Sequence, residues 1–157
     1  MSDLKVSEKQ IREVVSELGV GDENPKELFA AMTWSVWCEP GDGFAGLLTQ
    51  GLGTVDALSC ELDETSPVEV RSRLIDAGRD VDWIESFGDF ESSLLLARAR
   101  WQSRKALAPV VEAGNAHRQL SGSFLTPSNP LWPEQLADLK FNQPLALWLR
   151  GSVRHLG

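Results

Sequence analysis

Helix start and stop signals recur at short intervals through residues 7–122, so this part of the chain cannot form one long uninterrupted element. Three starts combine an N-cap residue with a capping-box partner or a proline: Ser7 with Gln10, Asn24 with Pro25, and Ser66 with Pro67 and Glu69. Gly19, Gly78 and the segment Glu39–Asp42 are typical of helix ends and breaks. These signals predict a series of short helices over residues 1–120.

Apolar residues within these pieces recur three or four positions apart, which places them on one face of each helix. Examples are Ile11, Val14, Val15 and Leu18, then Leu28, Phe29, Met32 and Val36, then Val70 and Leu74. Asp89 is a candidate cap for a longer helix from Phe90 to about Leu107, and a last helix is expected to end near Gln119. Hydrophobic residues make up 42% of the chain, enough for a packed core. We expect a mainly α fold.

The segment Gly51–Leu52–Gly53 separates two short helical pieces. Such a turn resembles a helix-hairpin-helix motif, which can present backbone N–H groups to a phosphate. The alternative is a tight glycine turn that only lets two helices pack together. The acidic surroundings favour this second interpretation.

The pattern changes after Gly122. Residues 123–127 and 144–151 each predict a strand, and Pro133 between them begins a short helix. Residues 145–149 are apolar without alternation, which is typical of a parallel strand covered on both faces. Strand, helix and strand in this order predict the opening of an α/β layer. We therefore expect a second domain to begin within residues 121–157.

Charge is distributed unevenly between these two parts. Residues 1–100 carry 9 Lys and Arg against 20 Asp and Glu, a net charge of −11, whereas residues 101–157 carry a net charge of +3. An acidic region repels a phosphate backbone. The stretch most compatible with nucleic acid is the basic cluster of Arg98, Arg100, Trp101, Arg104 and Lys105, where an exposed indole could stack on bases. The alternative is one solvated helix face.

Few residues suggest catalysis. The histidines are His117 and His155, the cysteines Cys38 and Cys60, and their spacing matches no metal or nucleophile motif. Phosphate-binding, dinucleotide-binding and zinc-protease motifs are absent from the sequence. We expect no catalytic, cofactor or metal site. There is also no long apolar run and no apolar leader, so we expect a cytoplasmic protein with reduced thiols that does not enter a membrane.

Residues 122–151, GSFLTPSNPLWPEQLADLKFNQPLALWLRG, resemble the DNA-processing protein A family (DprA, also called Smf). The matching positions are Trp132, Pro133, Leu136, Leu139, Pro144, Leu147, Trp148, Arg150 and Gly151. Asn129 stands where the family often has aspartate. Residues 34–58, with their Glu39–Asp42 turn and short helix pair, look like the family's helical N-terminal region.

The resemblance implies a SAM-like or helix-hairpin-helix-like domain over residues 1–120, then the first strands of a truncated Rossmann-like domain. Family members bind single-stranded DNA, act in DNA processing, natural transformation and recombination, load a RecA-type recombinase and form homodimers. Their glycine-rich DNA-binding turn follows the position of Gly151, and no such motif is present here, so we expect this chain to bind single-stranded DNA weakly at most. The alternative is a free-standing helical module that binds proteins and not DNA; a fragment of a Rossmann-like enzyme is a weaker third interpretation.

Overall fold

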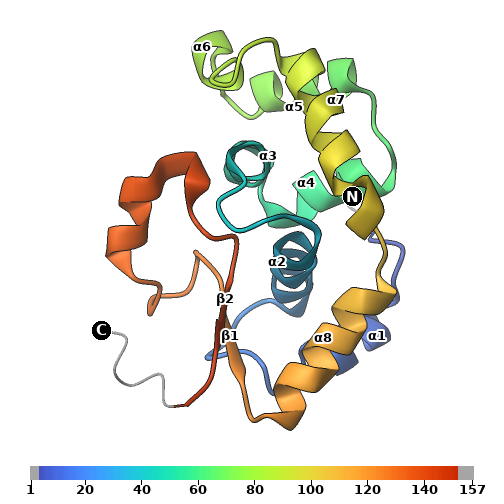
Figure 1. Ribbon diagram of the computed structural model, residues 1–157, viewed down its shortest axis with the longest axis vertical. Helices are drawn as coiled ribbons and strands as arrows, with labels where there is room; N and C mark the ends of the chain where they lie inside the picture. Colours follow the sequence, from blue (N-terminus) through green and yellow to red (C-terminus); the bar gives the residue numbers. More distant parts are fainter. Residues whose placement is uncertain (1–3, 152–157) are drawn as a thin grey trace.

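The computed structural model describes residues 4–151 and is mainly helical, with a short antiparallel sheet (Figure 1). Helix content is 61%, which confirms the mainly α prediction. The helical elements are α1 (Glu8–Val15), α2 (Pro25–Trp37), α3 (Gly43–Leu52), α4 (Thr54–Leu62), α5 (Pro67–Asp76), α6 (Val81–Ile84), α7 (Phe90–Trp101), the 3-10 helix η1 (Gln102–Arg104), α8 (Ala108–Gln119) and the 3-10 helix η2 (Glu134–Asn142). The strands are β1 (Ser123–Leu125) and β2 (Leu147–Leu149). Within the described residues, no helix is long and apolar enough to cross a membrane.

Side-chain caps begin most of the helices, and those of Ser7, Asn24, Ser66 and Asp89 were predicted. Ser7 accepts a hydrogen bond from the Gln10 backbone and forms a complete capping box. Further caps are Asn24 on α2, Asp42 on α3, Ser66 on α5, Asp80 on α6 and Asp89 on α7. These short-range bonds satisfy N–H groups that would otherwise lack a partner in the first turn.

Helix α2 lies at the centre of the molecule, between α1, α4 and α8 (Figure 1). Its residues from Leu28 to Trp34 are all buried, so it is covered on every side. The Trp34 ring meets the Trp101 ring edge to face at 5.3 Å between centroids, and Trp37 lies 6.3 Å from Trp34. This indole cluster joins α2 to the end of α7.

Helix α7 ends at Trp101, earlier than the predicted limit near Leu107. The Trp37 indole donates a hydrogen bond to the backbone oxygen of Ala106 at 3.1 Å. Pro109 also disfavours a continuing helix, because its ring would clash with the carbonyl four residues earlier. The chain therefore leaves α7 through η1 and restarts as α8.

The α3–α4 turn packs closely, as the glycine-turn interpretation expects. Gly53 has a φ of 88°, a conformation that favours glycine. A Cβ atom at Gly51 would lie 2.4 Å from Leu74 of α5. Gly51 thus allows α3 and α5 to approach, while Gly53 makes the turn.

The prediction that residues 145–149 form a parallel strand buried on both faces is wrong. Strand β2 pairs antiparallel with β1, with Trp148 opposite Phe124, and its residues are only half-buried. Parallel neighbours need a crossover that passes over the sheet, usually as an α-helix. Here the connection contains η2, a 3-10 helix interrupted at Lys140, which lies against α3 and returns the chain in the opposite direction.

The segment 122–151 packs directly on the helices. A Cβ atom at Gly46 of α3 would lie 1.9 Å from the backbone oxygen of Phe141, so only glycine fits there. The backbone N–H of Phe124 donates to the Leu18 oxygen at 2.8 Å. The Trp148 indole donates to the Ser35 hydroxyl at 3.1 Å. Apolar and polar contacts together hold this segment in place.

Candidate interaction site beside helix α7

The basic residues predicted as one cluster lie on two sides of α7 and η1. Arg98 and Lys105 face α4, whereas Arg100 and Arg104 face the turn between α2 and α3. Arg98 and Arg100 are two positions apart in the sequence, which is about half a turn of an α-helix. The structure therefore does not bring the four cations into one patch.

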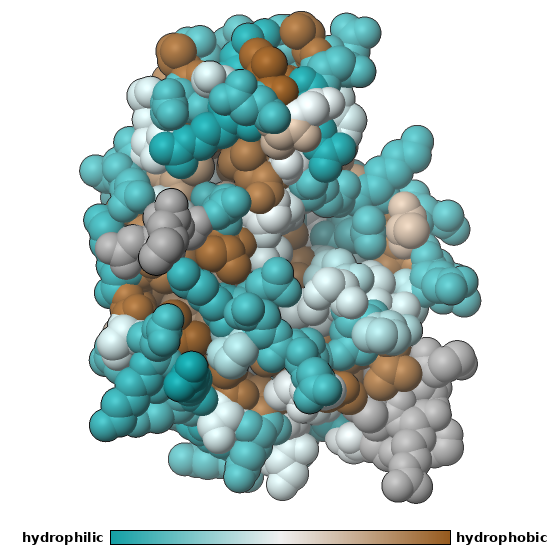
Figure 2. Space-filling view, turned by 180° about the vertical axis from the view of Figure 1, so that it is seen from behind, coloured by the Kyte–Doolittle hydropathy of each residue, from teal (hydrophilic) through white to brown (hydrophobic). Residues whose placement is uncertain are grey.

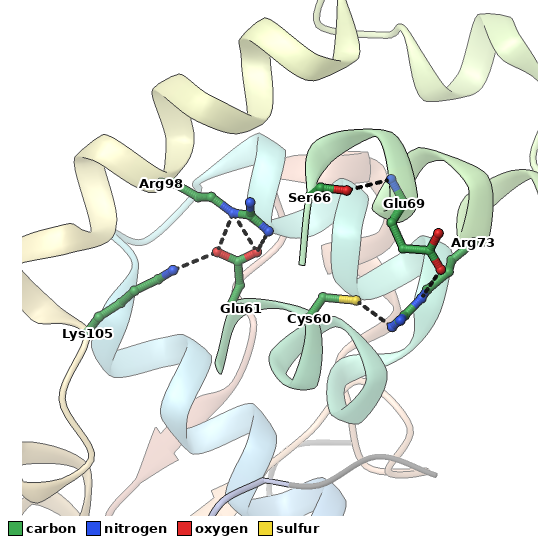
Figure 3. Close-up of polar contacts among 7 residues, drawn as sticks. All are labelled: Cys60, Glu61, Ser66, Glu69, Arg73, Arg98 and Lys105. Atoms are coloured by element: carbon green, nitrogen blue, oxygen red, sulfur yellow. Dashed lines mark hydrogen bonds and ion pairs between the residues drawn. The ribbon is translucent and has the colours of Figure 1, made fainter. Parts of the chain in front are cut away.

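Glu61 on α4 binds two of these cations (Figure 3). Its side chain is 0% exposed and lies 2.8 Å from both the Arg98 guanidinium and the Lys105 ammonium. Arg98 uses its Nε and Nη2 atoms, so the contact is bidentate. Breaking a buried pair by removing one partner costs about 3–5 kcal/mol. These two cations serve mainly to attach α7 and η1 to α4.

Cys60 lies next to Glu61 and contacts Arg73, whose Nη1 atom is 3.3 Å from the sulfur (Figure 3). Burial raises the pKa of the Cys60 thiol. Burial, and then the nearby Asp42 carboxylate, raise the pKa of the Cys38 thiol as well. Both thiols are therefore protonated near neutral pH, which makes them poor nucleophiles.

Trp101 is 1% exposed, so the prediction of an exposed, base-stacking indole at this position is wrong. Its Nε1 atom donates to the Asp42 carboxylate at 2.8 Å. The helical spacing of α7 turns Trp101 toward α2, with Ala97 and Leu94, and away from solvent. DNA contact by the other four residues stays a prediction.

Arg100 and Arg104 border a groove of about 750 Å³, which we call the α7 groove. One wall is a stripe of α7 and η1: Ser93, Leu96, Arg100, Ser103 and Arg104. The other wall is the turn Glu39–Gly43, with Phe44 and Phe87 at one end. Trp37 and Trp101 contribute to its lining from the core. This site was not predicted, because the sequence of Glu39–Asp42 indicates a helix break and gives no sign of the α7 side chains that lie opposite it.

Two carboxylates of the turn pair with the groove's arginines. Asp42, 7% exposed, lies 3.3 Å from Arg100 and also caps α3 through the Ala45 backbone. Glu39, 70% exposed, pairs with Arg104. Within residues 4–151, the Asp42 carboxylate is thus fixed by several bonds, while the Glu39 carboxylate is held only by a solvent-exposed ion pair.

Exposed apolar side chains gather at the end of the molecule formed by α5, α6 and α7 (Figure 2). The large ones in this region are Val68, Ile75, Val81, Phe87, Leu95 and Leu96. Leu96 and Phe87 line the α7 groove, whereas Leu95 does not. Leu96 and Phe87 therefore connect the groove to this group of exposed apolar side chains.

His117 is not a free surface residue. Its Nε2 atom lies 2.8 Å from the Ser123 oxygen, and its ring meets the Trp148 ring edge to face at 5.1 Å. The hydrogen bond to Ser123 holds the start of β1 in place. Neither Cys38 nor Cys60 contacts His117, so these residues form no cysteine–histidine nucleophile pair. His155 lies outside the described residues. Within residues 4–151, no three His, Cys, Asp or Glu side chains are grouped to hold a metal ion.

Comparison of the chain with protein-family models, curated proteins and solved structures found no match.

Proposed function

We propose that the chain acts in DNA processing as a DprA-like protein, and that residues 4–151 contribute protein contacts rather than the surface that holds DNA. The resemblance of residues 122–151 supports the first part. In this proposal residues 1–120 are a SAM-like or helix-hairpin-helix-like domain, and β1 and β2 belong to the start of a Rossmann-like domain. The working partners are single-stranded DNA and a RecA-type recombinase, with the protein as a homodimer in the cytoplasm.

The pairing of the basic side chains carries the second part of the proposal. Arg98, Lys105, Arg100 and Arg104 each lie within ion-pair distance of a carboxylate of their own chain. To reach Arg98 or Lys105, a DNA phosphate would have to displace Glu61 from a fully buried position, which is costly. The net charge of −8 adds long-range repulsion.

The test is a pair of binding measurements on the purified chain. Fluorescence anisotropy with labelled single-stranded DNA in about 150 mM salt should show no submicromolar binding. Biolayer interferometry with an immobilised RecA-type recombinase should show saturable binding. Submicromolar DNA binding that is lost when Arg100 and Arg104 are both replaced by alanine would overturn the protein-contact assignment.

A helical module that binds proteins, without a role in DNA processing, is the second candidate. The observation that favours it is the return of residues 122–151 onto the helices, with β1 and β2 paired and η2 against α3. A monomer that unfolds in one cooperative step and binds neither DNA nor the recombinase would support this candidate and contradict the first.

A further inference from the structure

The α7 groove has an apolar end and a cationic end. At the apolar end, Leu96 is 67% and Phe87 44% exposed, and the Phe87 ring packs on the Phe44 ring at 6.0 Å between centroids. At the cationic end, the side chains of Arg100 and Arg104 are 54% and 45% exposed. A ligand that matches both ends has a large apolar group next to negative charge.

The two carboxylates of the groove differ in how firmly they are held. The Asp42 carboxylate accepts hydrogen bonds from the Ala45 backbone and from the Trp101 indole, so it is held in place by groups of the protein itself. Among the described residues, the Glu39 side chain has only the exposed ion pair with Arg104, and such pairs contribute about 0–1 kcal/mol. An incoming carboxylate can therefore displace Glu39 at little cost.

The cationic end contrasts with its surroundings. Residues 1–100 contain 20 Asp and Glu against 9 Lys and Arg, so an acidic ligand is repelled over most of the helical surface. Arg100 and Arg104 are partly exposed cations that can attract an acidic ligand, and they lie beside exposed apolar side chains. Arginine and aromatic side chains are also the residue types that contribute most to binding at protein interfaces.

We propose that the α7 groove binds an acidic peptide segment of a partner protein that carries one large apolar side chain. The apolar side chain packs on Leu96 and Phe87, and the peptide carboxylates take the place of Glu39 at Arg104 and contact the exposed side of Arg100. This inference rests on the proposed protein-contact role and names its site and the chemistry of its partner. It does not depend on DNA.

The probe is a short fluorescein-labelled peptide with a run of aspartates and one phenylalanine, titrated with the purified chain. Leu96→Ala removes the apolar contact and Arg104→Ala removes the cation. Each is expected to weaken binding about tenfold, which corresponds to about 1.4 kcal/mol of binding free energy. Leu95→Ala is the matched control, since Leu95 is 58% exposed on the same helix but does not line the groove. Glu39→Gln should strengthen binding about threefold by removing the competing carboxylate.

Two control peptides test the recognised chemistry: one with alanine for phenylalanine and one with lysines for the aspartates. Both should bind at least about tenfold more weakly. Absence of saturable binding, equal effects of Leu96→Ala and Leu95→Ala, or equal binding of the lysine peptide would overturn the proposal. So would a concentration-dependent dimer that Leu96→Ala dissociates, because the groove would then bind a second copy. Peptide binding without recombinase binding would leave this inference standing and contradict only the proposed function.

Discussion

The Asn129 side-chain amide donates a hydrogen bond to the Glu23 carboxylate, joining the α1–α2 loop to the segment after β1. The Asn129 Oδ1 atom meanwhile accepts from the Leu131 backbone at 2.8 Å. Asparagine is suited to this position, which is 6% exposed, because it can donate to one neighbour and accept from the other. An aspartate at position 129 would keep the Leu131 bond and face Glu23 with a second negative charge.

Asn129→Asp should therefore lower the free energy of unfolding by about 1–3 kcal/mol at neutral pH, through the lost donor and the new repulsion. Urea denaturation followed by circular dichroism measures this change. Asn115→Asp adds the same charge at an exposed site next to Arg118 and should have little effect. Adding Glu23→Gln to Asn129→Asp should restore most of the loss, since glutamine can donate to aspartate. Failure of this rescue would contradict the pairing.

Glu61→Gln should lower the free energy of unfolding by about 3–5 kcal/mol, because Arg98 and Lys105 would remain partly buried without their anion. Glu39→Gln, which removes an exposed ion pair of the same chain, should change it by at most about 1 kcal/mol. Urea titrations of the two variants side by side make the comparison. Similar losses in both would mean that the Glu61 contacts contribute no more than a surface pair.

Gly46→Ala should be more destabilising than Gly51→Ala, although both put a methyl group on α3. The new methyl at position 46 meets the Phe141 backbone, whereas the one at position 51 meets the side chains of Leu74 and Trp83, which can move. We expect a cost of about 1–3 kcal/mol for Gly46→Ala, typical of overpacking. Thermal melting followed by intrinsic tryptophan fluorescence measures the effect. A Gly51→Ala loss as large as that of Gly46→Ala would contradict this interpretation.

Stability should fall as the pH rises above about 8.5, the ordinary pKa of a cysteine thiol. Burial raises the pKa of Cys38 and Cys60 in the folded state, so the unfolded chain loses its thiol protons at lower pH than the folded one. The stabilisation is complete below the unfolded pKa and is lost as the pH rises toward the folded pKa. Urea titrations from pH 7 to pH 10 measure the slope. Cys38→Ala should reduce it; an unchanged slope would contradict the assignment.

Local signals predicted the helix starts well. Ser7, Asn24, Ser66 and Asp89 cap their helices through bonds that span two or three residues, so a short window of sequence contains both partners. The helix ends were less predictable. Helix α7 ends earlier than predicted, and the segment after it is bonded to Trp37, which lies 69 positions before Ala106 in the sequence.

The candidate site could not be predicted in the same way. Whether Arg98 and Arg100 form one patch depends on Glu61 and Asp42, which are 37 and 58 positions away in sequence. The direction of β2 likewise depends on η2 packing against α3. An i, i+4 pair such as Leu96 and Arg100 does indicate a mixed apolar and basic stripe, and this is the one local signal of the α7 groove.

The Glu61 contacts also limit how the chain can change over evolution. A substitution of Arg98 or Lys105 alone leaves the buried carboxylate with one partner, and loss of Glu61 alone leaves two cations facing each other. Positions 61, 98 and 105 are therefore expected to vary together among descendants of this sequence. Apolar side chains could replace all three at once, whereas a lineage that changes them one at a time must pass through a less stable protein.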